Sequence, residues 1–327
     1  MQRTNAAFKV QKLMATPATT KWDARQIPSL TGKLALVTGA NSGIGYWTAV
    51  ELARHGAEVL LGCRNAEKGL AALNKLKAEV PAANAHVVEL DMASLASIRA
   101  FAASFIATGA PLDILVSNAG VMAVAKRQLT ADGFELQFGT NHLGHFALTG
   151  LLMPALLKSP APRVVTVASL AHRGGKIEFD NLQSERNYAP WDAYNNSKLA
   201  NILFSNELDR RAKAAHSRLV SVAVHPGISK TNIFQNGLAG RDFKSVFMSI
   251  FGGPLMQNDQ MGALPTLYAA SAPEAQGGQY IGPDGFMEFK GYPKVVEPKP
   301  QGKDAATEEK LWAASEKLTG VVYPPMS

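Results

Sequence analysis

The chain has a single cysteine, Cys63, among its 327 residues. One thiol excludes an internal disulfide framework and any metal site built from several cysteines. No apolar run reaches about 18 residues, so we expect no membrane-spanning helix. Residues 1–22 are polar and mixed, and they lack the apolar core of a signal peptide. Together these absences favour a cytoplasmic protein.

Basic residues are numerous but not clustered. The net charge is +7 and the isoelectric point is about 9.4. Such a balance can attract nucleotides, nucleic acid or a membrane surface. The aromatic and basic interleaving of a nucleic-acid-binding module does not occur, so we expect an ordinary basic enzyme surface and no nucleic-acid partner.

Hydrophobic residues make up 46% of the chain, which is enough for a substantial core. There is no internal repeat and no low-complexity block. We expect an amino-terminal extension over residues 1–29, followed by one domain over 30–327 with a carboxyl-terminal extension from 290. Met14 is a second plausible start, which leaves open whether residues 1–13 are native or a tag.

Strand and helix patterns alternate at short spacing along most of the chain. Short apolar runs predict strands at 34–38, 58–62, 85–90, 112–116, 163–167, 219–224 and 279–281. Helical patterns cover 46–55, 65–80, 94–108, 141–157, 192–213, 262–270 and 305–319. This alternation predicts an α/β fold with a doubly wound parallel sheet of about seven strands and helices on both faces. Residues 290–304, rich in Pro, Lys and Gly, predict a surface loop.

The glycine-rich segment Thr38–Gly45 lies between the first predicted strand and its helix. Glycines allow a tight turn and a close approach of the backbone to a ligand. The helix start that follows offers free N–H groups and a positive dipole end, which suit a pyrophosphate. Turns of this kind also occur without any ligand, so the motif alone leaves both interpretations open.

Tyr194 and Lys198 lie four residues apart at the start of a predicted long helix, so they share one helix face. A phenol titrates near pH 10 and is a poor base at neutrality. A lysine ammonium within a few ångströms would lower the pKa of the phenol, so that the tyrosine could exchange a proton with a substrate oxygen. A pair at this spacing also arises by chance on many helices.

These segments combine with others into a recognisable set. The further members are Asn118-Ala119-Gly120, Asn141, Ser169, Pro226-Gly227 and Thr231. In order and spacing the set resembles the short-chain dehydrogenase/reductase family, with a Rossmann-type single domain, from about residue 30 to 323. Finer motifs resemble its retinol-dehydrogenase-like branch, namely Cys63-Arg64-Asn65, Asn141-His142-Leu143-Gly144-His145, Ser197-Lys198-Leu199-Ala200-Asn201, His225-Pro226-Gly227 and Glu309-Lys310-Leu311-Trp312.

The resemblance implies catalytic roles for four residues. Tyr194 would be the general acid/base, and Lys198 would lower its pKa and hold the nicotinamide ribose. Ser169 would hydrogen-bond the reacting oxygen, and Asn141 would hold a water that links Lys198 to solvent. Taken singly, Ser169 could cap a loop and Asn141 could cap its helix. The gap from Ser169 to Tyr194 is 25 residues, longer than is usual in the family, so the resemblance does not define the pocket wall over 171–191.

The residue after the second strand indicates the cofactor. An acidic side chain there would bind a ribose 2′-hydroxyl, whereas a cation favours a 2′-phosphate. The chain has Cys63-Arg64 and no carboxylate at this point, which predicts NADP(H). The predicted cofactor contacts are Gly39, Asn41, Ser42, Gly43, Ile44, Gly45, Arg64, Asp91, Met92, Asn118, Ala119, Gly120, Tyr194, Lys198, Pro226, Gly227, Ile228 and Thr231. No histidine has a second ligand at metal-binding spacing, so we expect no metal.

Residues 228–262 form an apolar segment interrupted by Gly252-Gly253-Pro254. We expect a helical substrate lid, because the segment follows the sixth strand and would overhang the site. A helix pair that caps the core and a weak peripheral contact with a membrane are the alternatives. The sequence leaves both a monomer and a homo-oligomer open.

We therefore expect an NADP(H)-dependent oxidoreductase that interconverts a ketone or aldehyde and its alcohol. The apolar lid segment indicates a bulky hydrophobic substrate. A catalytically silent NADP-binding sensor or scaffold, a peripheral membrane protein and a reductase of conjugated double bonds are the alternative functions.

Overall fold

Eight strands form one sheet in the computed structural model, which describes residues 21–228 and 256–326. The strands are β1 (Leu34–Thr38), β2 (Glu58–Cys63), β3 (Ala85–Glu89), β4 (Ile114–Ser117), β5 (Arg163–Val167), β6 (Val220–Val224), β7 (Tyr280–Pro283) and β8 (Pro293–Val296). Their order is β3-β2-β1-β4-β5-β6-β7-β8, and only the β7–β8 pair is antiparallel. The predicted doubly wound α/β fold is confirmed.

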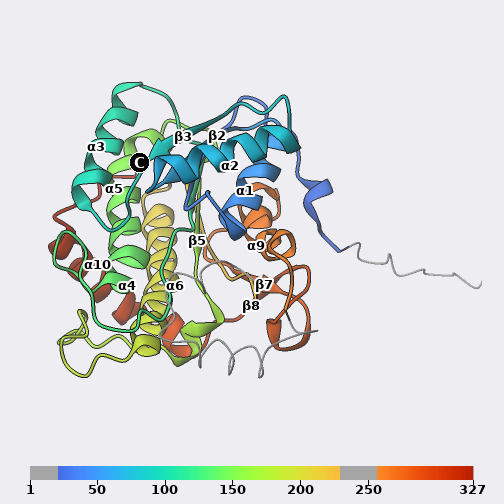
Figure 1. Ribbon diagram of the computed structural model, residues 1–327. Coiled ribbons are helices and arrows are strands. Elements are labelled where there is room, and N and C mark those ends of the chain that lie inside the picture. Colours follow the sequence, from blue (N-terminus) through green and yellow to red (C-terminus); the bar gives the residue numbers. More distant parts are fainter. Residues whose placement is uncertain (1–20, 229–255, 327) are drawn as a thin grey trace, which may run out of the picture.

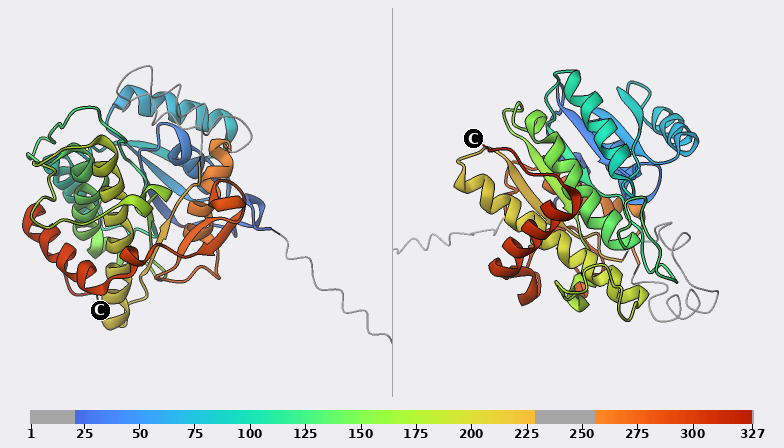
Figure 2. Two further views of the ribbon diagram at one scale, coloured as in Figure 1. Left: turned by 90° about the horizontal axis from the view of Figure 1, so that it is seen from below. Right: turned by 90° about the vertical axis from the view of Figure 1, so that its left-hand side faces the viewer.

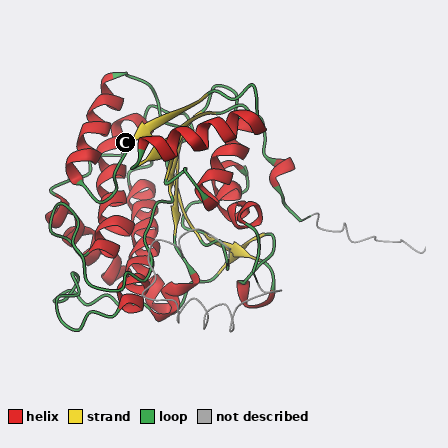
Figure 3. Ribbon diagram, in the orientation of Figure 1, coloured by secondary structure: helices red, strands yellow, loops and turns green. Residues whose placement is uncertain are grey.

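Helices cover both faces of this sheet (Figure 1). They are α1 (Gly43–Arg54), α2 (Ala66–Glu79), α3 (Leu95–Ala107), α4 (Leu136–Phe138), α5 (Gly144–Leu156), α6 (Pro190–Ala214), α9 (Asp259–Ser271) and α10 (Ala305–Thr319). Figure 3 shows that the strands run through the middle of the molecule between these helices. A parallel sheet buried on both faces explains why its strands are continuous apolar runs.

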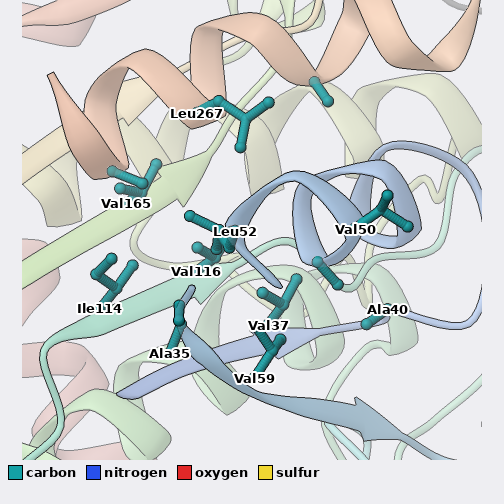
Figure 4. Packing of buried hydrophobic residues seen from close by; sticks show 14 of the residues in the cluster. Ala35, Val37, Ala40, Val50, Leu52, Val59, Ile114, Val116, Val165 and Leu267 are labelled. Carbon is teal, nitrogen blue, oxygen red and sulfur yellow. The ribbon is translucent and has the colours of Figure 1, made fainter. Parts of the chain in front are cut away.

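Alternate residues of β1, β2, β4 and β5 belong to two separate cores on opposite faces of the sheet. Ala35 and Val37 of β1 belong to a core that also contains residues of α1, α2 and α9, among them Leu267 (Figure 4). Leu36, between them, points to the opposite face and packs with residues of α3, α5 and α6. The sheet therefore holds the carboxyl ends of its strands between two rigid helical layers.

The carboxyl-terminal segment covers the outer side of α5 and α6, as the second view in Figure 2 shows for α10. Trp312 of α10 stacks on Phe204 with ring centroids 5.9 Å apart. Tyr323 donates a hydrogen bond of 2.7 Å to the backbone oxygen of Phe146 and packs on the same ring. The chain thus buries part of α5 and α6 with its own carboxyl-terminal residues.

The core begins earlier than the expected extension over residues 1–29 allows. Trp22, Ile27 and Leu30 are buried, and Trp22 makes an edge-to-face contact with Tyr268 of α9 at 5.2 Å. A short 3₁₀ turn over Ala24–Gln26, capped by Asp23, directs these apolar side chains inward. The residues before Lys21 lie outside the described part of the chain.

Two local predictions were wrong. The surface loop expected over 290–304 contains β8, a short edge strand that pairs with β7 in the register Tyr280↔Val296. Prolines confine it to the edge of the sheet, where an unpaired side is tolerated. Helix α6, expected over 192–213, begins at Pro190 with Ala189 at the cap position, so Asp192 lies in its first turn.

The expected lid can be followed only at its ends, since residues 229–255 and with them Thr231 lie outside the described residues. Within residues 21–228 and 256–326, no helix combines the length and the apolarity needed to cross a bilayer. The helix expected to begin at Gly262 begins at Asp259, where Asn258 accepts a capping hydrogen bond from the Met261 amide.

A buried carboxylate joins the beginnings of β1 and β4 to the turn between α5 and β5. Asp113, with a side chain 5% exposed, accepts hydrogen bonds from Lys33 Nζ at 2.9 Å, the Leu34 amide at 3.0 Å and Ser159 Oγ at 2.6 Å. Burial alone would raise the pKa of Asp113, but these donors outweigh it and hold the pKa below its ordinary value of 3.8.

Replacing Asp113 with Asn should lower the free energy of unfolding by about 1–3 kcal/mol, because donors remain buried without their charged acceptor. The carboxylate stabilises the fold above its unfolded pKa, and this contribution is lost as the pH falls through the lower folded value. The difference between wild type and variant in urea unfolding should therefore shrink below about pH 3.8. As the control, Asp180→Asn at an exposed ion pair should leave the unfolding curve unchanged.

Candidate active site

The polar residues singled out in the sequence lie at the carboxyl ends of neighbouring strands. The glycine turn follows β1, Asn118 follows β4, Ser169 follows β5 and His225 follows β6. In a parallel sheet these ends share one edge, where open α/β folds bind their ligands. The strand order reverses between β1 and β4, so the crevice of a doubly wound sheet lies at this point.

The glycine turn depends on its glycines for conformation and for space. Gly39 and Gly43 have positive φ angles of 67° and 60°. A side chain on Gly45 would clash with the Asn118 amide and would lie 2.6 Å from the Gly39 oxygen. Ser42 occupies the cap position of α1, but its side chain makes no capping hydrogen bond. The first turn of α1 is therefore not closed off by a protein side chain at its cap.

Arg64 lies beside this turn because β1 and β2 pair in parallel. Thr38 is aligned with Gly62, and the Gly39 amide donates to the Gly62 oxygen at 2.8 Å. Arg64 follows two residues later, is exposed, and has no hydrogen bond or ion pair with the described part of the chain. The guanidinium is thus free to meet an anion next to the glycine turn.

The turn after β4 is held against the turn after β1 by Thr38. Its Oγ1 accepts hydrogen bonds from the amides of Asn118 and Ala119, both at 2.9 Å. The Asn118 side chain donates to the Thr38 oxygen at 2.8 Å. Gly120 follows, and a Cβ on it would lie 2.9 Å from Asn141 Oδ1 and 3.7 Å from Lys198 Nζ. Gly120 therefore brings the backbone between two of the predicted site residues.

Asn141 does not begin its helix, which corrects the expected boundary. The helix starts at Leu136, and Asn141 lies in a π-helical turn over Gly139–Leu143. Its amide pairs with the Val121 backbone in both directions, at 2.8 Å and 2.9 Å, and donates to Ser197 Oγ at 2.9 Å. Asn141 is therefore a buried connector rather than a helix cap.

Tyr194, Ser169 and Lys198 meet at the end of β5. The Ser169 hydroxyl is near enough to the Tyr194 hydroxyl to affect the pKa of the phenol. Ser169 Oγ also accepts the Ala171 amide at 3.1 Å, so it caps the following 3₁₀ turn as well. Lys198 Nζ donates to the Val167 oxygen at 2.9 Å and lies 5.8 Å from the centre of the Tyr194 ring.

Burial dominates the titration of this pair. It raises the pKa of Tyr194 to about 12, against a smaller opposite effect of the Ser169 hydrogen bond. It lowers the pKa of Lys198 to about 8. The lowered phenol pKa expected from the sequence is thus not found in the free chain, because the lysine amino group is directed at the Val167 carbonyl instead of the phenol.

The other predicted contacts lie around the same edge. Asp91, after β3, accepts the Ala93 amide at 2.9 Å, and Met92 beside it is buried. Gly227, with φ of 66°, packs so closely on Phe289 that a side chain would clash with its oxygen. The Ile228 amide donates to the same oxygen at 2.7 Å. The turn after β6 is therefore held by the β7–β8 connection.

Sequence reasoning missed a polar cluster behind this turn. Glu288 accepts from Arg173 at 2.8 Å and from His225 Nε2 at 3.0 Å, and it has a positive φ of 62°. His172 donates from Nδ1 to the Ser169 oxygen at 2.7 Å and accepts the Lys299 amide at 3.3 Å. These residues come from segments far apart in the chain, so no local pattern could have revealed the cluster.

A dinucleotide fits the arrangement of the first two strands. The turn has the positive φ angles and the glycine contacts that a close backbone approach needs, and the helix start behind it is uncapped by Ser42. Arg64 supplies a cation without a protein partner in the described residues. Phosphate groups are the ligands that this combination of amides and guanidinium suits.

Comparisons with known proteins agree with this geometry. The sequence profile described as short chain dehydrogenase matches residues 33–241. The chain is 40% identical to Retinol dehydrogenase 13 of Homo sapiens over 300 residues, which cover 90% of this chain and 87% of the relative. It is 41% identical to Retinol dehydrogenase 14 of Mus musculus over 309 residues, covering 89% and 87%.

A solved structure resembles the chain over nearly its whole length. It is the crystal structure of an uncharacterised protein from Mycobacterium Paratuberculosis, with 42% sequence identity and a TM-score of 0.77. The match covers 93% of this chain and all of that one. The profile, the relatives and the fold together show that the chain belongs to the short-chain dehydrogenase/reductase family, in its retinol-dehydrogenase-like branch.

Proposed function

We propose that the protein is an NADP(H)-dependent oxidoreductase that interconverts an aldehyde or ketone and its alcohol, with Tyr194 as the general acid/base. The observation that carries this proposal is the buried Tyr194, whose pKa the nearby Ser169 hydroxyl affects and which lies with Lys198 beside the Asn118–Gly120 turn. A proton donor and a second hydroxyl at one point suit a carbonyl oxygen that gains charge during reduction.

A bound NADPH would supply a hydride for the carbonyl carbon. As the carbon–oxygen π bond breaks, Tyr194 gives its proton to the oxygen, and Ser169 stabilises the charge that develops there. Burial keeps the phenol protonated at neutral pH, since its pKa is raised to about 12. This protonation state favours reduction over alcohol oxidation near neutrality.

Lys198 and Asn141 would assist this proton transfer from Tyr194. The buried Lys198 ammonium is close enough to offset the phenolate charge left by proton transfer, and its Nζ is within reach of a ribose on the Gly120 side. Asn141 holds the Val121 backbone and Ser197 together, which keeps the wall behind Lys198 in place. We assign Asn141 to the proton path between Lys198 and solvent.

The choice of NADP(H) over NAD(H) rests on Arg64. It stands where an acidic side chain would bind an unmodified ribose, and its guanidinium has no competing carboxylate in the described chain. A planar guanidinium binds a phosphate through two parallel hydrogen bonds. The 2′-phosphate of NADP(H) is therefore the group that Arg64 would recognise.

The substrate should be bulky and apolar. Tyr194 packs with Met122 and Ala123, and the partly buried Trp191 and Ala171 lie against the same cluster. The two named relatives are retinol dehydrogenases, which points to a long polyene alcohol or its aldehyde as a first substrate class to test. A hydrophobic wall next to the proton donor favours such a molecule over a small hydrophilic one.

A carbonyl panel read by NADPH absorbance tests the proposed function. It should include retinaldehyde, medium-chain aldehydes, bulky ketones and a conjugated enone, each with NADPH and with NADH. We expect carbonyl reduction with at least a tenfold higher kcat/KM for NADPH, since one charged hydrogen bond contributes about 1.5–3 kcal/mol. A clear NADH preference would refute the cofactor assignment, and reduction of the enone double bond alone would refute the reaction type.

A further inference from the structure

A buried histidine lies between the cofactor side and the proton-transfer side of the site. His145, on α5, is 1% exposed. Its Nε2 is 2.9 Å from Thr38 Oγ1, the atom that holds the Asn118 and Ala119 amides. Its Nδ1 is 3.1 Å from the backbone oxygen of Asn141. One imidazole therefore contacts both Thr38, at the end of the strand before the glycine turn, and Asn141, which we assigned to the proton path from Lys198.

The partners determine the proton positions on this ring. The Asn141 carbonyl can only accept, so Nδ1 carries the proton and donates it. Thr38 Oγ1 already accepts from two amides, so its own hydrogen is donated. The Val116 oxygen at 3.3 Å and His145 Nε2 at 2.9 Å are the two acceptors in reach, and Nε2, which carries no proton when Nδ1 does, makes the shorter contact. The imidazole is thus neutral in this network, in agreement with burial that lowers the pKa of His145 to about 4.

The π-helical turn gives His145 this position. In the turn over Gly139–Leu143 the Gly144 amide bonds back to the Gly139 oxygen, five residues earlier instead of four. The widened turn accompanies an Asn141 carbonyl that accepts from the His145 ring. Such single π turns inside helices are often found at functional sites.

We propose that His145 is a positioning residue, which keeps the Thr38 turn and the Asn141 turn at a fixed separation for NADP(H) binding and proton transfer. The inference rests on the proposed function, because it assigns His145 to the same site. It predicts two separable effects. Loss of the Nε2 contact with Thr38 should weaken NADPH binding, and loss of the Nδ1 contact with Asn141 should slow proton transfer.

The chain offers a matched control on the same helical segment. His142 is also about 1% exposed, and its Nε2 meets Ser315 Oγ at 2.9 Å on the side of α10. Its ring packs on Phe138, Phe146 and Phe204, away from the glycine turn. A phenylalanine at either position removes the ring hydrogen bonds and adds the same small volume, so the two variants share the general cost of burying a larger, apolar ring.

The test compares His145→Phe with His142→Phe by three measurements: the Tm without cofactor, the NADPH Kd by fluorescence, and kcat with the best carbonyl of the panel. We expect both variants to lower the Tm. Only His145→Phe should raise the NADPH Kd and lower kcat, each about tenfold, as one unsatisfied buried group implies. If the two variants change Kd and kcat equally, His145 is merely structural and the inference fails.

Two conservative variants test the Thr38 contact and the Asn141 contact separately, and they replace His145→Phe if that variant does not fold. Gln places an acceptor near the Nε2 position, and Asn places a donor near the Nδ1 position. His145→Gln should therefore bind NADPH almost as wild type but turn over slowly, whereas His145→Asn should show the reverse. Equal behaviour of the two overturns the inference. If the wild type itself does not bind NADPH, the proposed function fails as well. If the wild type binds NADPH but the two variants behave alike, only the inference about His145 fails.

Discussion

Replacing Tyr194 with Phe should lower kcat by about 10³-fold, the range that a positioned proton donor contributes. The phenylalanine keeps the ring contacts with Met122, Ala123 and Trp191, so the pocket wall should stay in place. The NADPH Kd should change less than about threefold, because the lost hydroxyl lies near Ser169 rather than at the glycine turn. Single-turnover reduction and fluorescence titration measure the two quantities.

Tyr188→Phe is the control for this experiment. Tyr188 donates to the Val124 oxygen at 2.6 Å and accepts from Gln137 at 3.1 Å, so it is another part-buried tyrosine on the segment before α6. Loss of the Tyr188 hydroxyl should lower the free energy of unfolding but leave kcat within about threefold of wild type, because this hydroxyl is hydrogen-bonded to other protein groups. Undiminished turnover of Tyr194→Phe would reject Tyr194 as the general acid/base.

Arg64→Asp should reverse the cofactor preference. The change removes a guanidinium that would pair with the 2′-phosphate and introduces a carboxylate that repels it. We expect kcat/KM with NADPH to fall about 10²-fold and that with NADH to rise, since the carboxylate can accept from a ribose 2′-hydroxyl. Initial rates with both cofactors at one saturating carbonyl concentration give the ratio.

Lys77→Asp provides the same change of charge at the far end of α2, where the side chain is exposed. Lys77→Asp should leave the ratio of kcat/KM with NADPH to kcat/KM with NADH unchanged. It therefore controls for any effect of net charge on nucleotide binding. An Arg64→Asp enzyme that keeps its preference for NADPH would show that other residues recognise the phosphate. The ionic strength should be constant, because the contact of an exposed guanidinium is screened by salt.

Most of the fold could be predicted from local patterns. Apolar runs placed seven of the eight strands to within about two residues, because a parallel strand buried on both faces is a short continuous apolar run, whereas an amphipathic helix leaves a periodic pattern. The exception, β8, is an edge strand with exposed Lys294 and Val295 between prolines. Its pairing with β7 comes from tertiary packing, and no periodicity distinguishes it from a loop.

The candidate site could be predicted as a set of residues but not as a set of contacts. The glycine turn and the spacing of Tyr194 and Lys198 are visible in the sequence, since both depend on positions a few residues apart. That Lys198 is directed at the Val167 carbonyl, and that the Tyr194 pKa is consequently governed by burial, depends on how α6 lies against β5. Side-chain direction and burial are properties of packed elements.

By itself, then, the sequence determined the order of strands and helices, the glycine turn, and the Tyr–Lys pair, because these depend on neighbours in the chain. Only the tertiary structure decided that Asn141 lies inside a π turn and that His145 connects it to Thr38, 107 residues away. It also placed Glu288 between Arg173 and His225. Such contacts form when burial forces distant polar groups to satisfy one another.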